Sequence, residues 1–344
     1  MSVPDTRAAA TAPAIGPTRA KDSLLRRDRP VSRELVHRRA LAEVWITDTT
    51  QTGVDEFLIA TQLPRAHTLW SDRGNGYHDP LITVEIARQA CLVLGHLYYK
   101  VPRGWQFISR TIRLRVLDLA PYRDNCESPP EGLMRVRFTN RWEKEGELRG
   151  MSMEADFAIG PVQAATIQGD LAFFPREDYE RLRAHVRGRK PLQGARMRIV
   201  RHPLDPERVG RRLPANVAIE ESTAAAGAPG ESRYVAVIDE RHPSHFDHPQ
   251  DHVPGAMIME IYRQAAVATA TRDGFASAPG AVFTGCEVEL SDFAELDAPL
   301  ECSAHVIGRS EQARTQLALQ LHQLGTQIGG ARVELAFVRP ADER

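Results

Sequence analysis

Residues 259–267 read MEIYRQAAV, and residues 84–92 read VEIARQACL. The same three polar residues recur in register, at an offset of 175 positions: Glu85 with Glu260, Arg88 with Arg263, and Gln89 with Gln264. Charged and amide residues that recur in register within an apolar stretch are typical of a duplicated structural unit. The sequence therefore predicts two related halves, each with this stretch at its centre.

The repeat extends beyond this stretch in both directions. At the same offset His67 matches His242 and Asp72 matches Asp247, and the halves end alike in GDLAFFP (169–175) and VELAFVRP (333–340). We expect an N-terminal domain, a linker and a C-terminal domain over residues 31–175, 176–205 and 206–344. Residues 1–30 are rich in Ala, Pro and charge, which is typical of a disordered tail.

Each half combines one strongly apolar helix with several alternating segments. The pattern predicts helices over residues 80–99 and 255–271, the first opened by Asp79 before Pro80. A helix that is apolar on nearly every side must be covered, and antiparallel strands can cover it. We therefore predict an α+β fold of two tandem hotdog domains, each a sheet wrapped around a central helix, paired within the chain. Period-two alternation places strands near residues 41–48, 56–63, 111–119, 133–142, 148–160, 164–174, 234–239, 283–290, 300–308, 314–323 and 331–338.

The composition excludes several classes of protein. Lys+Arg 44 nearly cancels Asp+Glu 45, so there is no general attraction to nucleic acid or to an anionic membrane. The N-terminus lacks the apolar core of a signal peptide, and no stretch is long and apolar enough to cross a bilayer. The four cysteines form no CxxC pair and are expected to be buried, reduced thiols. We expect a cytoplasmic protein without a cofactor.

The charged residues of the two helices are the candidate functional groups. Glu85 precedes Arg88 by three positions, and Glu260 precedes Arg263 in the same way. Burying such groups costs several kcal/mol unless they are paired. A paired polar cluster that fixes the contact between the halves would explain them. A functional cleft is the interpretation that we favour, because perturbed carboxylates gather where chemistry is done.

The segment HFDHPQDHVPG (245–255) precedes the second helix. Gly255 would let a ligand approach the first N–H groups of the helix, which are unpaired and carry its positive dipole end. His248 and His252 are candidate proton carriers at that end. The histidine spacing is not HExxH and the segment lies before the helix, so we expect no metal site.

The segments FDHPQDHVPGAMIMEIYRQAA (246–266), RELVHRRALAEVWITD (33–48), FLIATQLPRAH (57–67) and DPLITVEIARQA (79–90) resemble the AfsA-type γ-butyrolactone autoregulator synthases of actinobacteria, including the furan-signal branch. The resemblance covers about residues 33–340. It implies transfer of a β-ketoacyl group from acyl carrier protein to dihydroxyacetone phosphate. Hotdog dehydratases share the spacing from Pro254 to Glu260 but lack extra residues before Pro254. Ala256 also stands where the family commonly has a larger residue.

The resemblance implies functional weight on Glu85, Glu260 and Arg263. We expect Glu260 to act as the base, with His252 as a relay, and the N–H groups near Gly255 to hold the thioester oxygen. We expect Arg263 to bind the phosphate of the acceptor. An arginine that pairs with a glutamate lowers the pKa of that glutamate, so the role of Arg263 as a phosphate ligand competes with the role of Glu260 as a base. Further expected substrate contacts are Arg88, His248, Gln264 and Gln89.

Two other interpretations remain open at this point. One is a hotdog dehydratase or thioesterase that acts on acyl thioesters, and the other is a non-catalytic protein that binds an acyl group or an autoregulator. The sequence leaves open the acyl chain, whether ring closure is enzymatic, and which half holds the productive site. The chain is expected to be a monomer with an internal pseudo-dimer, or a homodimer.

Overall fold

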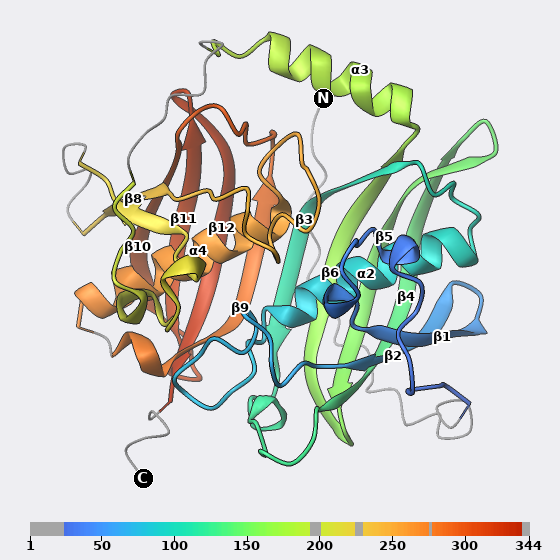
Figure 1. Ribbon diagram of the computed structural model, residues 1–344, viewed down its shortest axis with the longest axis horizontal. Coiled ribbons are helices and arrows are strands. Elements are labelled where there is room, and N and C mark those ends of the chain that lie inside the picture. The colour runs from blue at the N-terminus through green and yellow to red at the C-terminus, as the bar shows by residue number, and fades with distance from the viewer. Residues whose placement is uncertain (1–23, 193–200, 224–229, 275–276, 339–344) are drawn as a thin grey trace.

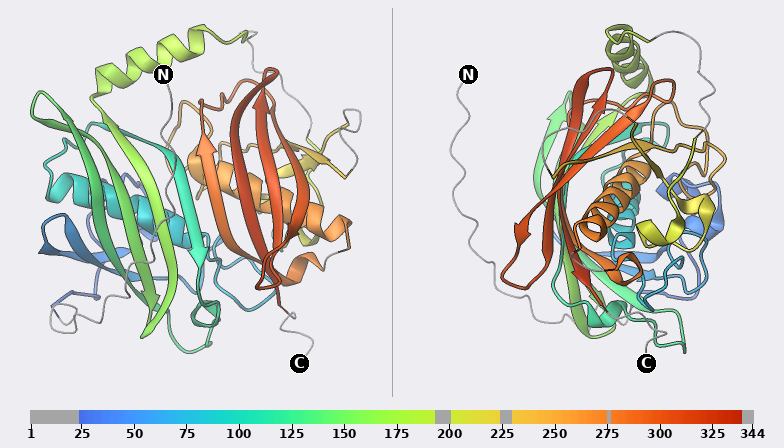
Figure 2. Two further views of the ribbon diagram at one scale, coloured as in Figure 1. Left: turned by 180° about the vertical axis from the view of Figure 1, so that it is seen from behind. Right: turned by 90° about the vertical axis from the view of Figure 1, so that its left-hand side faces the viewer.

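The computed structural model describes residues 24–192, 201–223, 230–274 and 277–338. Within them, twelve antiparallel strands form one continuous sheet, and the two long central helices pack on the same face of it (Figures 1 and 2). The first half contains β1 (Ile46–Gly53), β2 (Glu56–Gln62), α2 (Ile82–Leu97), β3 (Gln106–Val116), β4 (Glu131–Lys144), β5 (Glu147–Ile159) and β6 (Val162–Phe174). The second half follows α3 (Arg176–Gly188) and contains β7 (Ile219–Glu221), β8 (Ser232–Ala236), α4 (Gly255–Arg272), β9 (Ala281–Leu290), β10 (Leu300–Arg309), β11 (Thr315–Gln323) and β12 (Thr326–Phe337). Short 3-10 turns lie at η1 (Arg33–Val36), η2 (Leu41–Glu43), η3 (Ala120–Tyr122), η4 (Pro206–Val209), η5 (Pro214–Asn216) and η6 (Ala278–Gly280).

The order of the strands shows the duplication. The sheet runs β1-β2-β4-β5-β6-β3-β9-β12-β11-β10-β8-β7. Counted outward from the centre, β3-β6-β5-β4-β2-β1 on one side corresponds strand by strand to β9-β12-β11-β10-β8-β7 on the other. Strands β3 and β9 join the halves as an antiparallel pair in which Arg113 lies opposite Glu287. The predicted fold, two hotdog halves paired within one chain, is confirmed.

Helices α2 and α4 are buried along nearly their whole length. Ile86 and Ala90 of α2 and Ile261 and Ala265 of α4 have no exposed surface. The first helix begins at Ile82, slightly later than predicted. No side chain caps its first residue, but Oδ1 of Asp79 accepts the backbone N–H of Leu81, directly before the helix, at 3.1 Å. The burial of these apolar stripes under the sheet is the main attraction that holds each helix in place.

The predicted strands are present, with small differences at their ends. The segment 41–48 begins with the turn η2, and its strand starts only at Ile46. The hairpin predicted at EKEGE (143–147) joins β4 to β5, and Glu145 and Gly146 both have positive φ, as a tight two-residue turn requires. Cys126 is exposed, contrary to the expectation that all four thiols are buried.

The segments expected outside the two domains also contain ordered structure. Helix α3 lies within the expected linker and runs along the upper edge of the molecule in Figure 1. Residues 1–23 of the expected tail lie outside the described residues, but Leu25 is buried against Leu58 and Ala60. The domain boundaries stay predictions. No helix of the described residues is long and apolar enough to cross a membrane.

Candidate active site

Glu85 lies at the centre of a polar cluster in the first half. Its Oε1 accepts N–H groups of Arg38 at 2.7 Å, Arg88 at 2.8 Å and Gln89 at 2.8 Å, and its Oε2 accepts the Nε of Arg88 at 2.8 Å. We call Glu85, Arg38, Arg88 and Gln89 the first cluster. Its two arginines come from separate segments, so the carboxylate ties η1 and its following loop to α2.

Glu260 lies at the centre of the matching cluster in the second half. Arg211, Arg263 and Gln264 donate six hydrogen bonds to its two oxygens, at 2.5–3.2 Å. Asp79 of the first half adds a second carboxylate, since its Oδ2 lies 3.5 Å from Nη2 of Arg211. We call Glu260, Arg211, Arg263 and Gln264 the second cluster.

Both glutamates remain ionised in these surroundings. Burial alone would raise the pKa of Glu85, but the charges of Arg38 and Arg88 outweigh it and hold the pKa well below its usual range. The pKa of Glu260 is likewise held well below its usual range, against burial, by Arg211 and Arg263. A general base works best with a pKa near the working pH, so neither carboxylate is tuned as a base while these pairs are intact.

Each cluster is completed by a carboxylate from the opposite half. Asp247 accepts the backbone N–H groups of Arg39 at 2.6 Å and Ala40 at 2.8 Å, next to the first cluster. Asp72 accepts the N–H groups of Arg212 at 3.0 Å and Leu213 at 3.2 Å, next to the second cluster. Asp72 and Asp247, which match in the sequence, therefore make equivalent contacts: each binds backbone N–H groups of the opposite half.

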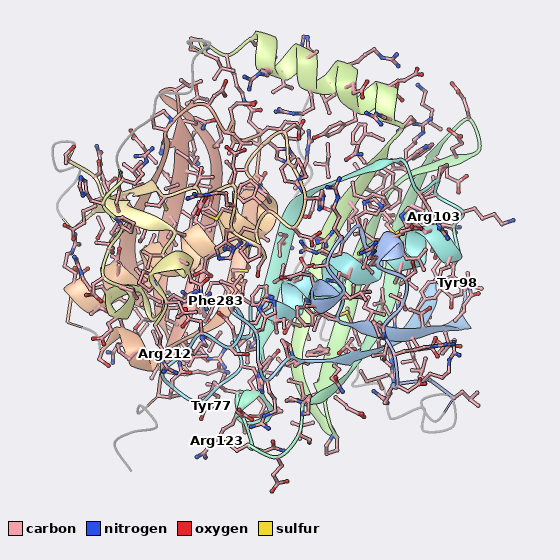
Figure 3. The ribbon with its side chains drawn as sticks, in the orientation of Figure 1. Tyr77, Tyr98, Arg103, Arg123, Arg212 and Phe283 are labelled. Carbon is pink, nitrogen blue, oxygen red and sulfur yellow. The ribbon has the colours of Figure 1, made fainter. Side chains whose placement is uncertain are left out.

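The loop that carries Asp72 and Asp79 is held at its far end as well. Tyr77 forms an isolated antiparallel bridge with Arg123, and both are seen at the lower edge of the molecule in Figure 3. The backbone N–H of His78 donates to the carbonyl of Tyr122 at 2.7 Å. These contacts hold in place the loop, which precedes α2 in the sequence and contacts the second half through Asp72 and Asp79.

The two clusters differ in their access to solvent. In the first, 36% of the Arg88 side chain is exposed, and 31% of the neighbouring His248. In the second, the side chains of Arg211 and Arg263 are 0% and 1% exposed. The repeat places Arg73 and Asp79 beside the second cluster where the first has His248 and Pro254. An extra ion pair therefore closes the second cluster, while the first opens to solvent.

The N-termini of α2 and α4 also differ in their access to solvent. The start of α2 is buried, and Asp79 accepts the backbone N–H of Leu81 directly before it. Helix α4 follows Pro254, which provides no side-chain cap, and Gly255 is exposed. The first N–H groups of α4 can therefore donate hydrogen bonds to an anionic oxygen of a ligand.

The structure places most of the predicted site residues in or beside the two clusters. Glu85, Arg88 and Gln89 meet in the first cluster, and Glu260, Arg263 and Gln264 meet in the second. His248 binds Asp247 beside the first cluster. The described contacts of His252 are instead with Asp251, Tyr179 and Phe293, which belong to neither cluster.

Sequence reasoning missed the second arginine of each cluster. VHRRALAEVWI (36–46) and VGRRLPANVAI (209–219) align Arg38 with Arg211, but at an offset of 173 rather than 175. A shift of two residues hides the match when only a gap-free repeat is sought. The two arginines were therefore detectable, whereas the partners Asp79 and Arg73 were not, because they have no charged counterparts of the same kind in the other half.

Comparison with known proteins agrees with this architecture. The family description "A-factor biosynthesis hotdog domain" (AfsA) matches residues 20–174 and 192–339. A Streptomyces virginiae protein named 2-oxo-3-(phosphooxy)propyl 3-oxoalkanoate synthase is 33% identical over 304 residues, 87% of this chain and 95% of that protein. A protein of the same name from Streptomyces griseus is 29% identical over 69% of this chain and 74% of its own length.

Among solved structures, an acyl-CoA thioesterase II from Mycobacterium marinum matches 90% of this chain and 99% of its own, at 9% identity and a TM-score of 0.47. The family match extends over both halves and most of the chain. The chain belongs to the AfsA family of A-factor biosynthesis hotdog proteins.

Proposed function

We propose that this chain is an acyltransferase that makes the ester named by its relatives. A 2-oxo-3-(phosphooxy)propyl 3-oxoalkanoate is a 3-oxo acid esterified to the free hydroxyl of dihydroxyacetone phosphate. The reaction joins a 3-oxoacyl group to that hydroxyl, which begins the biosynthesis of a γ-butyrolactone-type signalling molecule. Family membership over both halves and 33% identity to a synthase of this name support the proposal.

The acyl donor in this proposal is a thioester on acyl carrier protein. Ester formation from a free acid is unfavourable in water, whereas a thioester supplies an activated carbonyl and a good leaving group. Acyl carrier protein presents such 3-oxoacyl thioesters in the cytoplasm, where dihydroxyacetone phosphate is also formed. The chain would then act without a cofactor, as one copy with its internal pair of halves.

We place the reaction at the first cluster. The observation that carries this assignment is the difference in access: Arg88 and His248 are about one third exposed, while the second cluster is sealed. A substrate cannot reach Glu260 without breaking its hydrogen bonds to Arg211 and Arg263. In this proposal the second cluster holds the halves together, and the first performs the chemistry.

Arg88 is the proposed ligand for the acceptor phosphate. Its described hydrogen bonds all come from Nε and Nη2, which bind Glu85 and the carbonyl of Val36. The exposed part of the guanidinium can bind a phosphate, and its planar shape suits two oxygens at once. Glu85 then fixes the orientation of the guanidinium, and the uncapped N–H groups at Gly255 stabilise the developing negative charge on the thioester oxygen.

The test is mass spectrometry of the purified chain with a 3-oxoacyl thioester and dihydroxyacetone phosphate. The proposal predicts a phosphorylated keto ester, or its ring-closed product with one water fewer, together with free thiol. Free 3-oxo acid as the sole product would instead identify a thioesterase. An intact thioester in the presence of both substrates would contradict any transferase function.

A further inference from the structure

The segment before α4 places a carboxylate and a histidine beside the first cluster. Nδ1 of His248 lies 3.2 Å from Oδ2 of Asp247. Only 1% of the Asp247 side chain is exposed, against 31% of His248. A buried carboxylate thus orients the ring of a histidine that solvent and substrate can reach.

The hydrogen bonds determine which nitrogen of His248 carries the proton. Nε2 of His248 lies 2.8 Å from the amide nitrogen of Gln250. An amide nitrogen can only donate, so Nε2 must accept. The ring proton is then on Nδ1, where it donates to Asp247, and the lone pair is on Nε2. This is the arrangement that a general base needs once a substrate hydroxyl replaces Gln250.

The pair is fixed to the first half rather than to its own. Asp247 accepts the N–H groups of Arg39 and Ala40, and the adjacent Arg38 donates to Glu85 at 2.7 Å. Burial would raise the pKa of Asp247, but those two N–H groups lower it below its usual value, so Asp247 stays ionised. The carboxylate is therefore available to stabilise a positively charged imidazolium.

His37 is another titratable group in the surroundings of His248. Burial and, to a smaller extent, the charges of His96, Arg88 and His248 lower the pKa of His37 to about 3. His37 is consequently neutral and does not compete for a proton. The contacts of Asp247 with Arg39 and Ala40, next to Arg38, are what place His248 beside the first cluster that contains Arg88.

We propose that Asp247 and His248 of the second half form the proton-transfer pair of the site whose anion ligand, Arg88, belongs to the first half. This rests on the proposed acyl transfer. Nε2 of His248 takes the proton from the acceptor hydroxyl while its oxygen bonds to the thioester carbonyl carbon. The carbon–sulfur bond then breaks, and the imidazolium returns the proton to the leaving thiolate. Thioester and alcohol become ester and thiol, with nothing else consumed.

The test is His248→Ala with added imidazole. Loss of a general base should lower the rate of ester formation by roughly 10²–10⁴-fold. Because His248 is partly exposed, free imidazole can occupy the space left by the side chain, and the rate should rise with imidazole concentration. A histidine that only supports the structure would not be replaced in this way. His305→Ala, an exposed histidine on β10, should keep the wild-type rate and show no response to imidazole.

Asp247→Asn tests the orienting carboxylate with the shape of the side chain kept. The variant should lose kcat while the KM for either substrate changes little, because the carboxylate acts on the transition state and not on binding. Imidazole should not restore it, since His248 still fills its place.

The outcomes separate this proposal from the proposed function. A wild-type chain without transferase activity contradicts the function itself. An active wild type with an unaffected His248→Ala, or a His248→Ala that imidazole does not restore, overturns only the proton-transfer pair. Loss and imidazole rescue in His252→Ala instead would move the base to the pair formed by His252 and Asp251.

Discussion

At the scale of single residues, the two helix glutamates have the same partners but different surroundings. Each is bound by two arginines and one glutamine, yet only the first cluster includes a guanidinium that solvent reaches. Asp79 and Arg73 enclose the second cluster. Identical residue types therefore stand in two different settings, a partly exposed cluster at Glu85, where we propose that the reaction occurs, and an internal ion-pair network at Glu260.

Glu260→Gln should destabilise the fold. The change leaves Arg211 and Arg263 buried with one compensating carboxylate fewer, and breaking a buried pair in this way typically costs about 3–5 kcal/mol. Urea unfolding followed by circular dichroism measures the loss. Glu85→Gln is the matched control and should lose less, because Arg88 remains partly hydrated. If Glu260→Gln keeps the wild-type unfolding free energy but loses activity, Glu260 takes part in the reaction after all.

At the scale of elements, α3 is attached by charges rather than by an apolar face. Glu295 has no exposed surface and accepts N–H groups from Arg183, Arg187 and Lys190, at 2.8–3.0 Å. Arg183 also binds Asp251 at 2.8 Å, and its guanidinium lies over the ring of Phe293. Helix α3 therefore connects the end of the first half to the segment just before α4.

The attachment of α3 should weaken in acid. Burial would raise the pKa of Glu295, but its bonds to Arg183 and Lys190 lower the pKa to about 2. A carboxyl with a lowered folded-state pKa stabilises the fold above its unfolded value, near 4.3, and this contribution disappears as the pH falls towards 2. The protection of the α3 amides, which is the slowing of their exchange relative to that of an unfolded chain at the same pH, should fall over that range. In Glu295→Gln this protection should be low already at neutral pH and change little with acid; equal pH dependence of protection in both proteins would contradict this account.

The elements show what sequence alone can predict. Helices α2 and α4 were predictable because apolar residues recur around their whole circumference, and the strands because apolar residues alternate. The docking of α3 was not, since Arg183 is charged and its partner Glu295 is over a hundred positions away. The difference in solvent access between the two clusters could not be predicted either. It depends on Arg73 and Asp79, which belong to the first half but lie beside Glu260 and its arginines in the second half.

At the scale of the whole molecule, the halves complete each other. The sheet is continuous through β3 and β9, and each half contributes an aspartate that binds backbone N–H groups of the other. The open site contains Arg88 and Glu85 from one half and Asp247 and His248 from the other. The duplication therefore yields one accessible site and one sealed contact, so that neither half alone contains the proposed machinery.

Asp72→Ala should weaken the contact between the halves. Asp72 accepts the N–H groups of Arg212 and Leu213, and the amide of Asn216 at 2.7 Å. Leaving a buried donor without an acceptor costs about 1–3 kcal/mol, so calorimetry should show a lower Tm. Asp118→Ala is the control, because Asp118 is exposed and, within the described part of the chain, its carboxylate accepts the N–H of Ala120 in its own half. An unchanged Tm in Asp72→Ala would show that Asp72 adds nothing measurable to the contact between the halves.

The most direct test of the account is the preference of Arg88→Ala between two acceptors, dihydroxyacetone phosphate and dihydroxyacetone. Product formation is measured by mass spectrometry with one 3-oxoacyl thioester, and circular dichroism confirms that the variant is folded. A charge-assisted contact contributes about 1.5–3 kcal/mol, so the wild type should prefer the phosphorylated acceptor roughly ten- to a hundredfold. The account predicts that Arg88→Ala loses most of this preference, and that Arg88→Lys, which keeps the charge without the planar fork, restores only part of it. A folded Arg88→Ala with the full wild-type preference would contradict the assignment of the reaction to the first cluster.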